Sequence, residues 1–359
     1  MSDVVITSPG QVTPEWLTSV LSAGDALTAG AVTGVAIEGG QGNWSSNAKL
    51  LVNYSADAAG TRPDKLFLKM VAIDLDDDEY FDDSEVTYYT RDYVNVPDAP
   101  LLHCYHAAFA DTGAAYHLLL DDVSSTHVDA TGRAPTPGSA VALADGLAAM
   151  HASWWGAGRL TDAGHPLHDA FHIQQFVDIA APGVPHVLVA CAADLPVHWP
   201  ALIEQIFERH PTALIGRSRN PVGFTLIHGD PGCANILVPR DGDRPIYLID
   251  RQPFNWSLTT WLGVYDLVYA TILDWPTEIR RQLEVPMLKR YHDQLQLHGV
   301  ADYSWHQLWT DYQLMIPMGV YIAVEYSRGG LNSKSMATWL PYLQRTLVAC
   351  EDHDCQARW

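Results

Sequence analysis

The stretch from residue 226 to residue 250 constrains the fold most, because three short apolar runs alternate there with polar loops. The first loop reads His-Gly-Asp-Pro-Gly-Cys-Ala-Asn, and the third run ends on Asp250. Each run is rich in β-forming residues, is bounded by Gly, Pro or Asp, and is too short for a helix, so the pattern predicts strands. The turn-forming linker 239–245 predicts that the second and third runs form a hairpin.

Three polar residues of this stretch are candidates for chemistry. Asp230 opens the loop, Asn235 closes it, and Asp250 ends the third strand. Two carboxylates and an amide are the hard oxygen ligands that suit Mg²⁺. A carboxylate left free of the metal can accept a proton from a substrate hydroxyl. The alternative is a loop whose Asp and Asn residues cap turns.

His228-Gly229-Asp230, with Asn235 and Asp250 at this spacing and apolar strands around them, resembles the catalytic loop of aminoglycoside phosphotransferases, choline kinases and ecdysteroid-kinase-like proteins. The resemblance implies an α+β, bilobal protein-kinase-like fold, with an antiparallel sheet and a helix in the N-lobe and a mainly helical C-lobe. It implies transfer of the γ-phosphoryl group of ATP or GTP to a small-molecule hydroxyl. Asp230 would be catalytic, and Asn235 and Asp250 would hold Mg²⁺ and with it the nucleotide.

The resemblance also assigns roles in the N-terminal part. A glycine-rich loop over 39–47 lies between predicted strands 32–38 and 48–54, and Gly40, Gly42 and Ser45 would cover the nucleotide phosphates. The alternative is an ordinary hairpin.

Lys69 lies inside an apolar strand over 65–71, where a buried amine requires an anionic partner. The resemblance offers the nucleotide phosphates and Glu85, on a helix that Ser84 would cap. The alternative is that Lys69 protects a sheet edge from aggregation.

An apolar strand over 115–120 resembles the hinge of this fold, so we expect lobes at 1–122 and 123–359 and a connecting loop over 124–137. Thr13 and Pro14 predict a helix start. Further helices are predicted near 143–154, 258–273, 277–298, 302–328 and 334–352.

Several further residues lie in or near the loop. Arg251-Gln252 departs from the family pattern; Gln252 favours the ecdysteroid-kinase-like branch, and Arg251 could pair with an acid or reach phosphate. We interpret His228 and His151 as structural. Asp266 resembles a family acid that braces the catalytic loop, although on a helix it could equally face solvent.

The net charge of −21 argues against nucleic acid as a partner. It fits a cationic substrate steered into an acidic cleft, or excess acid that only maintains solubility. The acidic segment 74–83 does not distinguish between these two explanations of the charge.

No apolar segment reaches the length of a membrane span and the first residues are not signal-like, so we expect a cytoplasmic protein. Five scattered cysteines make a disulfide framework improbable, and the His and Cys clusters at 165–172 and 350–355 match no zinc pattern.

The sequence leaves the substrate and the oligomeric state open. An aminoglycoside or other cationic antibiotic, a nucleoside-type antibiotic, a sugar and an amino alcohol are all compatible with it. Tryptophans could stack on such molecules or pack in the core: Trp256, Trp261, Trp275, Trp305 and Trp309. A nucleotide-binding regulator without turnover is the alternative from another class. The presence of Lys69, Asp230, Asn235 and Asp250 together argues against it, because a non-catalytic module does not need all four.

Overall fold

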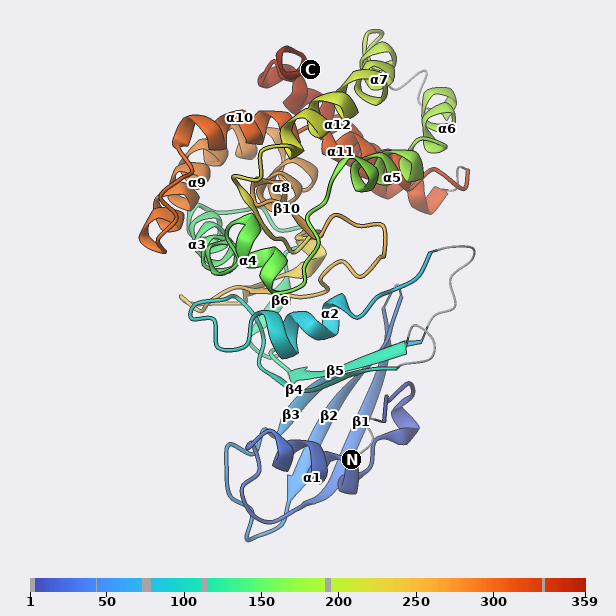
Figure 1. Cartoon of the computed structure of the whole chain (residues 1–359). Coiled ribbons are helices and arrows are strands. Elements are labelled where there is room, and N and C mark those ends of the chain that lie inside the picture. Colours follow the sequence, from blue (N-terminus) through green and yellow to red (C-terminus); the bar gives the residue numbers. More distant parts are fainter. Residues whose placement is uncertain (1–3, 43, 73–78, 111–114, 191–194, 331–332) are drawn as a thin grey trace.

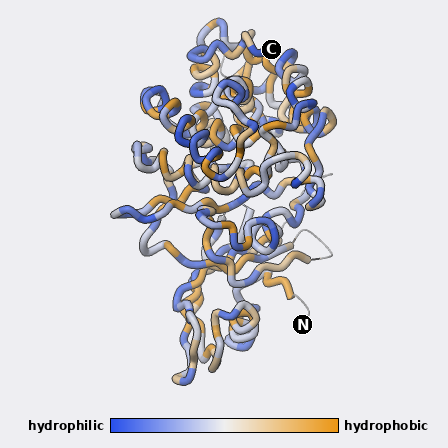
Figure 2. Tube along the Cα trace, turned by 60° about the vertical axis from the view of Figure 1, so that its left-hand side comes forward, coloured by the Kyte–Doolittle hydropathy of each residue, from blue (hydrophilic) through white to orange (hydrophobic). Residues whose placement is uncertain are grey.

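The computed structural model describes residues 4–42, 44–72, 79–110, 115–190, 195–330 and 333–359. Figure 1 shows two lobes, an N-terminal sheet with helix α1 against it and a C-terminal part built mainly of helices. This is the predicted α+β arrangement. In Figure 2 hydrophobic and hydrophilic residues are intermixed along the strands and helices, as expected of elements that bury one face.

The N-lobe sheet is antiparallel, and within the described residues it has five strands in the order β1-β2-β3-β5-β4. Helix α1 (Pro14–Ala23) begins as predicted, because the Thr13 side chain accepts a hydrogen bond from the Trp16 N–H at 3.1 Å. Its apolar face packs into the core below the sheet. The strands are β1 (Val32–Gln41), β2 (Ser46–Tyr54), β3 (Lys65–Ala72), β4 (Cys104–Phe109) and β5 (Ala115–Asp121).

The glycine-rich segment is shorter as a loop than predicted. β1 continues to Gln41 and β2 begins at Ser46, so that Gly40 pairs with Asn47 inside the ladder. The Gly42 N–H donates to the Ser45 carbonyl at 2.7 Å and closes a tight turn. The predicted loop over 39–47 is therefore wrong in extent, because glycine in an extended conformation continues a strand as readily as it ends one.

The helical segment that carries Glu85 is short. α2 (Ser84–Thr87) continues into a π-helical turn, η2 (Tyr88–Asp92). Asp83 occupies the N-cap position and Ser84 is the first helical residue, so the predicted cap is wrong by one position. Single π-helical turns occur frequently at functional sites.

The C-lobe combines helices with two small sheets. β7 (Phe224–Leu226) pairs with β10 (Thr260–Leu262), and β8 (Ile236–Pro239) pairs with both β6 (His127–Asp129) and β9 (Tyr247–Leu248). The hairpin of the second and third apolar runs is thus confirmed. The helices and helical turns are η1 (Pro9–Gln11, in the N-lobe), α3 (Pro137–Ser153), α4 (Ala157–Asp162), α5 (Ala170–Ala180), α6 (Gly183–Ala190), α7 (Trp199–Ser218), η3 (Cys233–Asn235), α8 (Val264–Val268), η4 (Tyr269–Leu273), α9 (Thr277–Leu297), α10 (Trp305–Met315), α11 (Met318–Glu325), α12 (Ser333–Asp352) and η5 (Cys355–Arg358).

Three predicted segments differ from the structure. β6 lies in the predicted connecting loop 124–137, and β10 lies at the start of the predicted helix 258–273. Strands of three residues are too short to produce a recognisable periodicity. The predicted helix over 302–328 is two helices, α10 and α11, with Pro317 at their junction.

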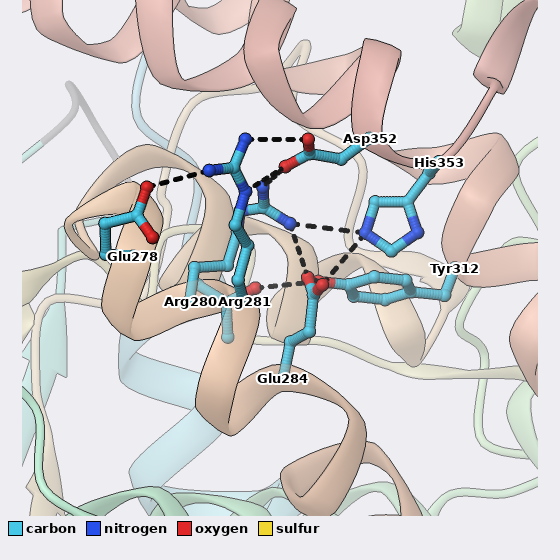
Figure 3. A network of polar contacts seen from close by, with 8 residues as sticks. Glu278, Arg280, Arg281, Glu284, Tyr312, Asp352 and His353 are labelled. Carbon is cyan, nitrogen blue, oxygen red and sulfur yellow. Dashed lines mark hydrogen bonds and ion pairs between the residues drawn. The ribbon is translucent and has the colours of Figure 1, made fainter.

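A buried ionic network joins α9 to the end of α12 (Figure 3). The Arg280 side chain is 1% exposed and donates to Glu284 at 2.8 Å and to Asp352. The Glu284 carboxylate also contacts the His353 ring at 3.0 Å. The network therefore links α9 to the end of α12 through charges that lie beside opposite charges. None of the described helices has both the length and the apolar character needed to cross a membrane.

Candidate active site

One buried acid, Asp266, binds the backbone of the loop between β7 and η3. Asp266, on α8, is fully buried and accepts hydrogen bonds from the His228 N–H at 2.7 Å and the Gly229 N–H at 2.9 Å. The His151 ring lies 3.1 Å from the same carboxylate. Burial raises the pKa of Asp266, but the hydrogen bond and charge from His151 outweigh it and hold the pKa below its usual value. Asp266 therefore braces the loop and does not face solvent.

His228 connects the loop to the strand that precedes Asp250. Its Nε2 donates to the Ile249 carbonyl at 3.0 Å, and its Nδ1 accepts from the Asp230 N–H at 3.3 Å. Burial lowers the pKa of His228 to about 4, so the ring is neutral near pH 7. A neutral imidazole that donates at one nitrogen and accepts at the other is a structural link between the two segments, as the sequence indicated.

Asp230 is half-buried at the start of the loop. Burial, together with the charges of Asp250 and Asp274, raises the pKa of Asp230 to about 7, against hydrogen bonds from Tyr269 and Asn235 that lower it. A carboxylate with a pKa near neutrality is ionised often enough to accept a proton and basic enough to hold it.

Asn235 and Asp250 are brought together by the β8–β9 pairing. The Ile249 N–H donates to the Asn235 carbonyl at 3.0 Å, which places Asp250 next to Asn235. The Asn235 amide Nδ2 donates to the Asp230 carbonyl at 2.9 Å and leaves Oδ1 available as an acceptor. Asp250 has a left-handed backbone with φ of 57°, which is uncommon for a residue other than glycine and is often found at functional sites.

Lys69 joins the N-lobe to this group. Its Nζ lies 2.7 Å from Glu85 Oε2 and 2.6 Å from Asp250 Oδ1, and the Tyr116 hydroxyl donates to Glu85 Oε2 at 2.5 Å. Burial lowers the pKa of Lys69, but the charges of Glu85 and Asp250 outweigh it and raise the pKa above its usual value. Lys69 lies on a central strand, between β2 and β5, so its interpretation as an edge charge is wrong.

Among the described residues, the polar contacts of the glycine-rich turn lie within its own hairpin. Ser45 donates to the Asn47 side chain at 3.1 Å, and Gly40 and Gly42 make contacts within the hairpin. A Cβ on Gly40 would meet only the Asn47 carbonyl, at 3.9 Å, so the backbone there stays accessible. Whether Gly40, Gly42 and Ser45 cover a nucleotide stays a prediction.

Two groups of residues near the site were not found by sequence reasoning. An aromatic cluster joins the glycine-rich turn to the segments that carry Phe81 and Phe254, with Trp44 6.3 Å from Phe81 and Phe81 4.7 Å from Phe254 between ring centroids. Tyrosines and acids beside Asp230 form the second group, Tyr269, Asp274, Tyr326 and Tyr342. The positions of these residues depend on how loops and helices pack, and no local sequence pattern predicts such packing. The only indication in the sequence was the number of aromatic residues.

Other residues considered in the sequence are structural or stay undecided. Trp261 is fully buried and packs on Phe224, and Trp256 and Trp275 are also buried in the core. Within the described ranges no group of three or more His, Cys, Asp or Glu side chains could hold a metal ion. The central residues of the acidic segment, 73–78, lie outside the described residues. Tyr80, Phe81 and Asp82 are described, and the Phe81 backbone pairs with Phe254.

Known structures provide the comparison that sequence searches do not. No protein-family model matches the chain, and no curated protein sequence matches it. A spectinomycin phosphotransferase in complex with ADP and spectinomycin superposes with a TM-score of 0.51 at 11% identity, over 94% of this chain and 98% of that chain. An ethanolamine kinase from Plasmodium vivax gives 0.56 at 14%, over 90% and 83%. A choline kinase from Cryptosporidium parvum gives 0.56 at 10%, over 96% and 98%.

The chain has the protein-kinase-like fold of aminoglycoside phosphotransferases and choline kinases. The fold predicted from the catalytic-loop resemblance is thereby confirmed. These similarities do not distinguish the ecdysteroid-kinase-like branch, which stays a prediction. At 10–14% identity they establish the fold, and the function has to be argued from the site.

Proposed function

We propose that this protein is a small-molecule kinase that transfers the γ-phosphoryl group of ATP, or of GTP, to a substrate hydroxyl. One observation carries the proposal: Lys69, from the N-lobe sheet, and Asp250, from the C-lobe hairpin, meet at 2.6 Å beside a carboxyl, Asp230, whose pKa is about 7. The buried cation comes from the N-lobe and the two carboxylates come from the C-lobe. This combination is suited to binding phosphate groups together with a metal cation. We propose residues 1–122 as the nucleotide-binding lobe and 123–359 as the catalytic and substrate-binding lobe.

Asp230 is the proposed base. The ionised carboxylate orients the substrate hydroxyl and accepts its proton as the oxygen attacks phosphorus. The Tyr269 hydrogen bond stabilises the ionised form, and the nearby negative charges favour protonation. Burial also favours protonation and is the largest of these effects; together they give the carboxyl a pKa of about 7.

Asn235 and Asp250 are the proposed magnesium ligands. The donor set fits this ion, because Asp250 has one oxygen beyond the Lys69 contact and Asn235 Oδ1 accepts no hydrogen bond from the described residues. Magnesium sites of phosphotransferases commonly use one or two protein oxygens and complete the shell with phosphates and water. When bound, Mg²⁺ neutralises charge on the phosphate oxygens. Lys69, oriented by Glu85, would add positive charge beside the α- and β-phosphates, and Gly40, Gly42 and Ser45 would cover them.

The substrate is proposed to be a small hydroxyl compound, with a cationic one preferred. Asp274 supplies negative charge near Asp230, and the carboxylates of Asp230, Glu325 and Asp274 all lie near the hydroxyl of Tyr326. Aromatic rings and acids together suit an amine-bearing hydroxyl compound. Proteins of similar fold include a glucosamine kinase and an aminopropanol kinase besides the spectinomycin enzyme. Antibiotics, amino sugars and amino alcohols are therefore the first classes to test, followed by sugars and nucleosides.

The test is an ATP-consumption screen across these classes, with the phosphorylated product identified by mass spectrometry. We expect ADP formation that requires a hydroxyl compound and Mg²⁺, and loss of that activity in Asp230→Asn. Asp241→Asn is the matched control, since Asp241 is an exposed acid in the β8–β9 turn. Nucleotide binding without phosphorylation of any compound class would overturn the proposal and favour a regulator.

A further inference from the structure

Arg251 is a buried cation without an ionic partner in the described part of the chain. Only 3% of the surface of Arg251 is exposed to solvent, and its Nε is buried without a hydrogen-bond partner among the described residues. Burying a guanidinium costs free energy unless something compensates for the lost water. The compensating contact present is with an aromatic face, because Arg251 Cζ lies 5.5 Å from the centroid of the Tyr88 ring. Desolvated cation–π contacts are among the stronger ones of their kind.

Tyr88 connects two elements that carry site residues. It is the first residue of η2, directly after α2, and therefore lies one helical turn from Glu85. Its ring also lies edge-on to His228, with 6.1 Å between the centroids. The hydroxyl has only a weak contact, 3.7 Å to Met150 Sδ, so the ring faces account for most of its interactions.

Asp250 is thereby held on both sides. The preceding residue, Ile249, is fixed through its carbonyl by His228, and the following residue, Arg251, is fixed by Tyr88. A left-handed backbone at a non-glycine residue persists only where the surroundings impose it. The two contacts provide that constraint, and both converge on Tyr88.

We propose that Arg251 is a positioning residue, which through its contact with Tyr88 fixes the Asp250 carboxylate relative to the Lys69–Glu85 pair. The inference rests on the proposed function only in that Asp250 binds the magnesium of a nucleotide complex. It explains why a residue next to the metal ligand is a buried cation that contacts no acid among the described residues. Arg251 adjusts the geometry of the site and does not itself touch the reacting groups.

The experiment is calorimetric binding of ADP with and without Mg²⁺. Arg251→Met keeps the chain length and removes the charge, and we expect Mg²⁺-dependent ADP binding to weaken roughly 5- to 30-fold, the range for 1–2 kcal/mol. Binding of ADP without Mg²⁺ should change little, because Lys69 and Glu85 stay in place. Tyr88→Leu should weaken binding as Arg251→Met does, whereas Tyr88→Phe keeps the ring and should bind like wild type.

Two further variants separate positioning from general packing. The double variant Arg251→Met/Tyr88→Leu should bind no more weakly than either single variant, because both remove one shared contact. Arg159→Met is the matched control; it removes a cation–π contact with Trp154 of similar length, 5.0 Å, which involves none of the proposed site residues. Should Arg251→Met fail to fold, Arg251→Lys keeps the charge without the planar guanidinium and should show a partial loss.

Wild-type Mg²⁺–ADP affinity in the Arg251 variants would overturn the proposal, and so would additive losses in the double variant. These outcomes are independent of turnover. If no hydroxyl compound is phosphorylated while Arg251→Met still weakens Mg²⁺–ADP binding, the proposed function fails and the positioning role of Arg251 stands.

Discussion

Asp266→Asn tests the brace beneath the catalytic loop. The fully buried carboxylate accepts two backbone N–H groups, at 2.7 and 2.9 Å, and lies 3.1 Å from the His151 ring. Asparagine keeps one acceptor oxygen and turns an amide NH₂ group toward a backbone donor. At least one buried N–H group is then left without a partner, and the charge that strengthened the others is lost.

The cost follows from these contacts. Removing one partner of a buried, hydrogen-bonded charge typically costs about 3–5 kcal/mol. We expect the free energy of unfolding to fall by roughly that amount at pH 7, measured by urea denaturation with the slope unchanged. Asp162→Asn is the control, because Asp162 is exposed at the end of α4.

The pH dependence gives a second check of the same contacts. The folded-state pKa of Asp266 lies below its usual value. Its contribution to stability is therefore complete above the unfolded pKa of about 3.9 and is lost as the pH falls through the folded pKa. The difference between wild type and Asp266→Asn should shrink in acid. A loss below about 1 kcal/mol at pH 7, the net value of one ordinary hydrogen bond, would refute the bracing role.

The other predictions concern the base, the lysine and the ionic network. Turnover at limiting substrate should decrease as the pH falls below about 7, because Asp230 must be ionised; a flat profile from pH 5 to 8 would contradict this. Tyr269→Phe removes a hydrogen bond that lowers the pKa of Asp230 and should move the acidic limb to higher pH. Lys69→Ala should raise the nucleotide KM and lower kcat, whereas Lys65→Ala, at an exposed position of the same strand, should change neither. Arg280→Met removes the Arg280 charge beside buried Glu284, which keeps its contacts with His353 and Tyr312, and should cost up to about 3–5 kcal/mol of stability in urea denaturation; equal stability to wild type would show that the contacts of Arg280 contribute nothing.

The catalytic-loop region was predictable because short-range patterns determine it. Strand-forming runs bounded by turn residues fixed the β8–β9 hairpin, and that hairpin places Asn235 next to Asp250. Lys69, a lysine inside an apolar run, likewise indicated a buried anionic partner, which is Glu85. In both cases a local rule and a burial argument lead to the same contact.

The remaining features depend on long-range packing. The contact of Arg251 with Tyr88 joins residues far apart in sequence, and no spacing rule relates them. The rise in the pKa of Asp230 requires knowledge of how deeply the loop is buried. The extent of β1 was wrong because glycine is compatible with both a strand and a turn.

The central claim is that Asp230, Asn235, Asp250 and Lys69 form one phosphoryl-transfer site. The most direct measurement follows γ-labelled ATP incubated with each hydroxyl compound and Mg²⁺, for wild type and Asp230→Asn. The account predicts label on a hydroxyl product with wild type, and a decrease of roughly 10²- to 10⁴-fold in the variant, the usual contribution of a positioned base. Equal transfer of label by both proteins would contradict it.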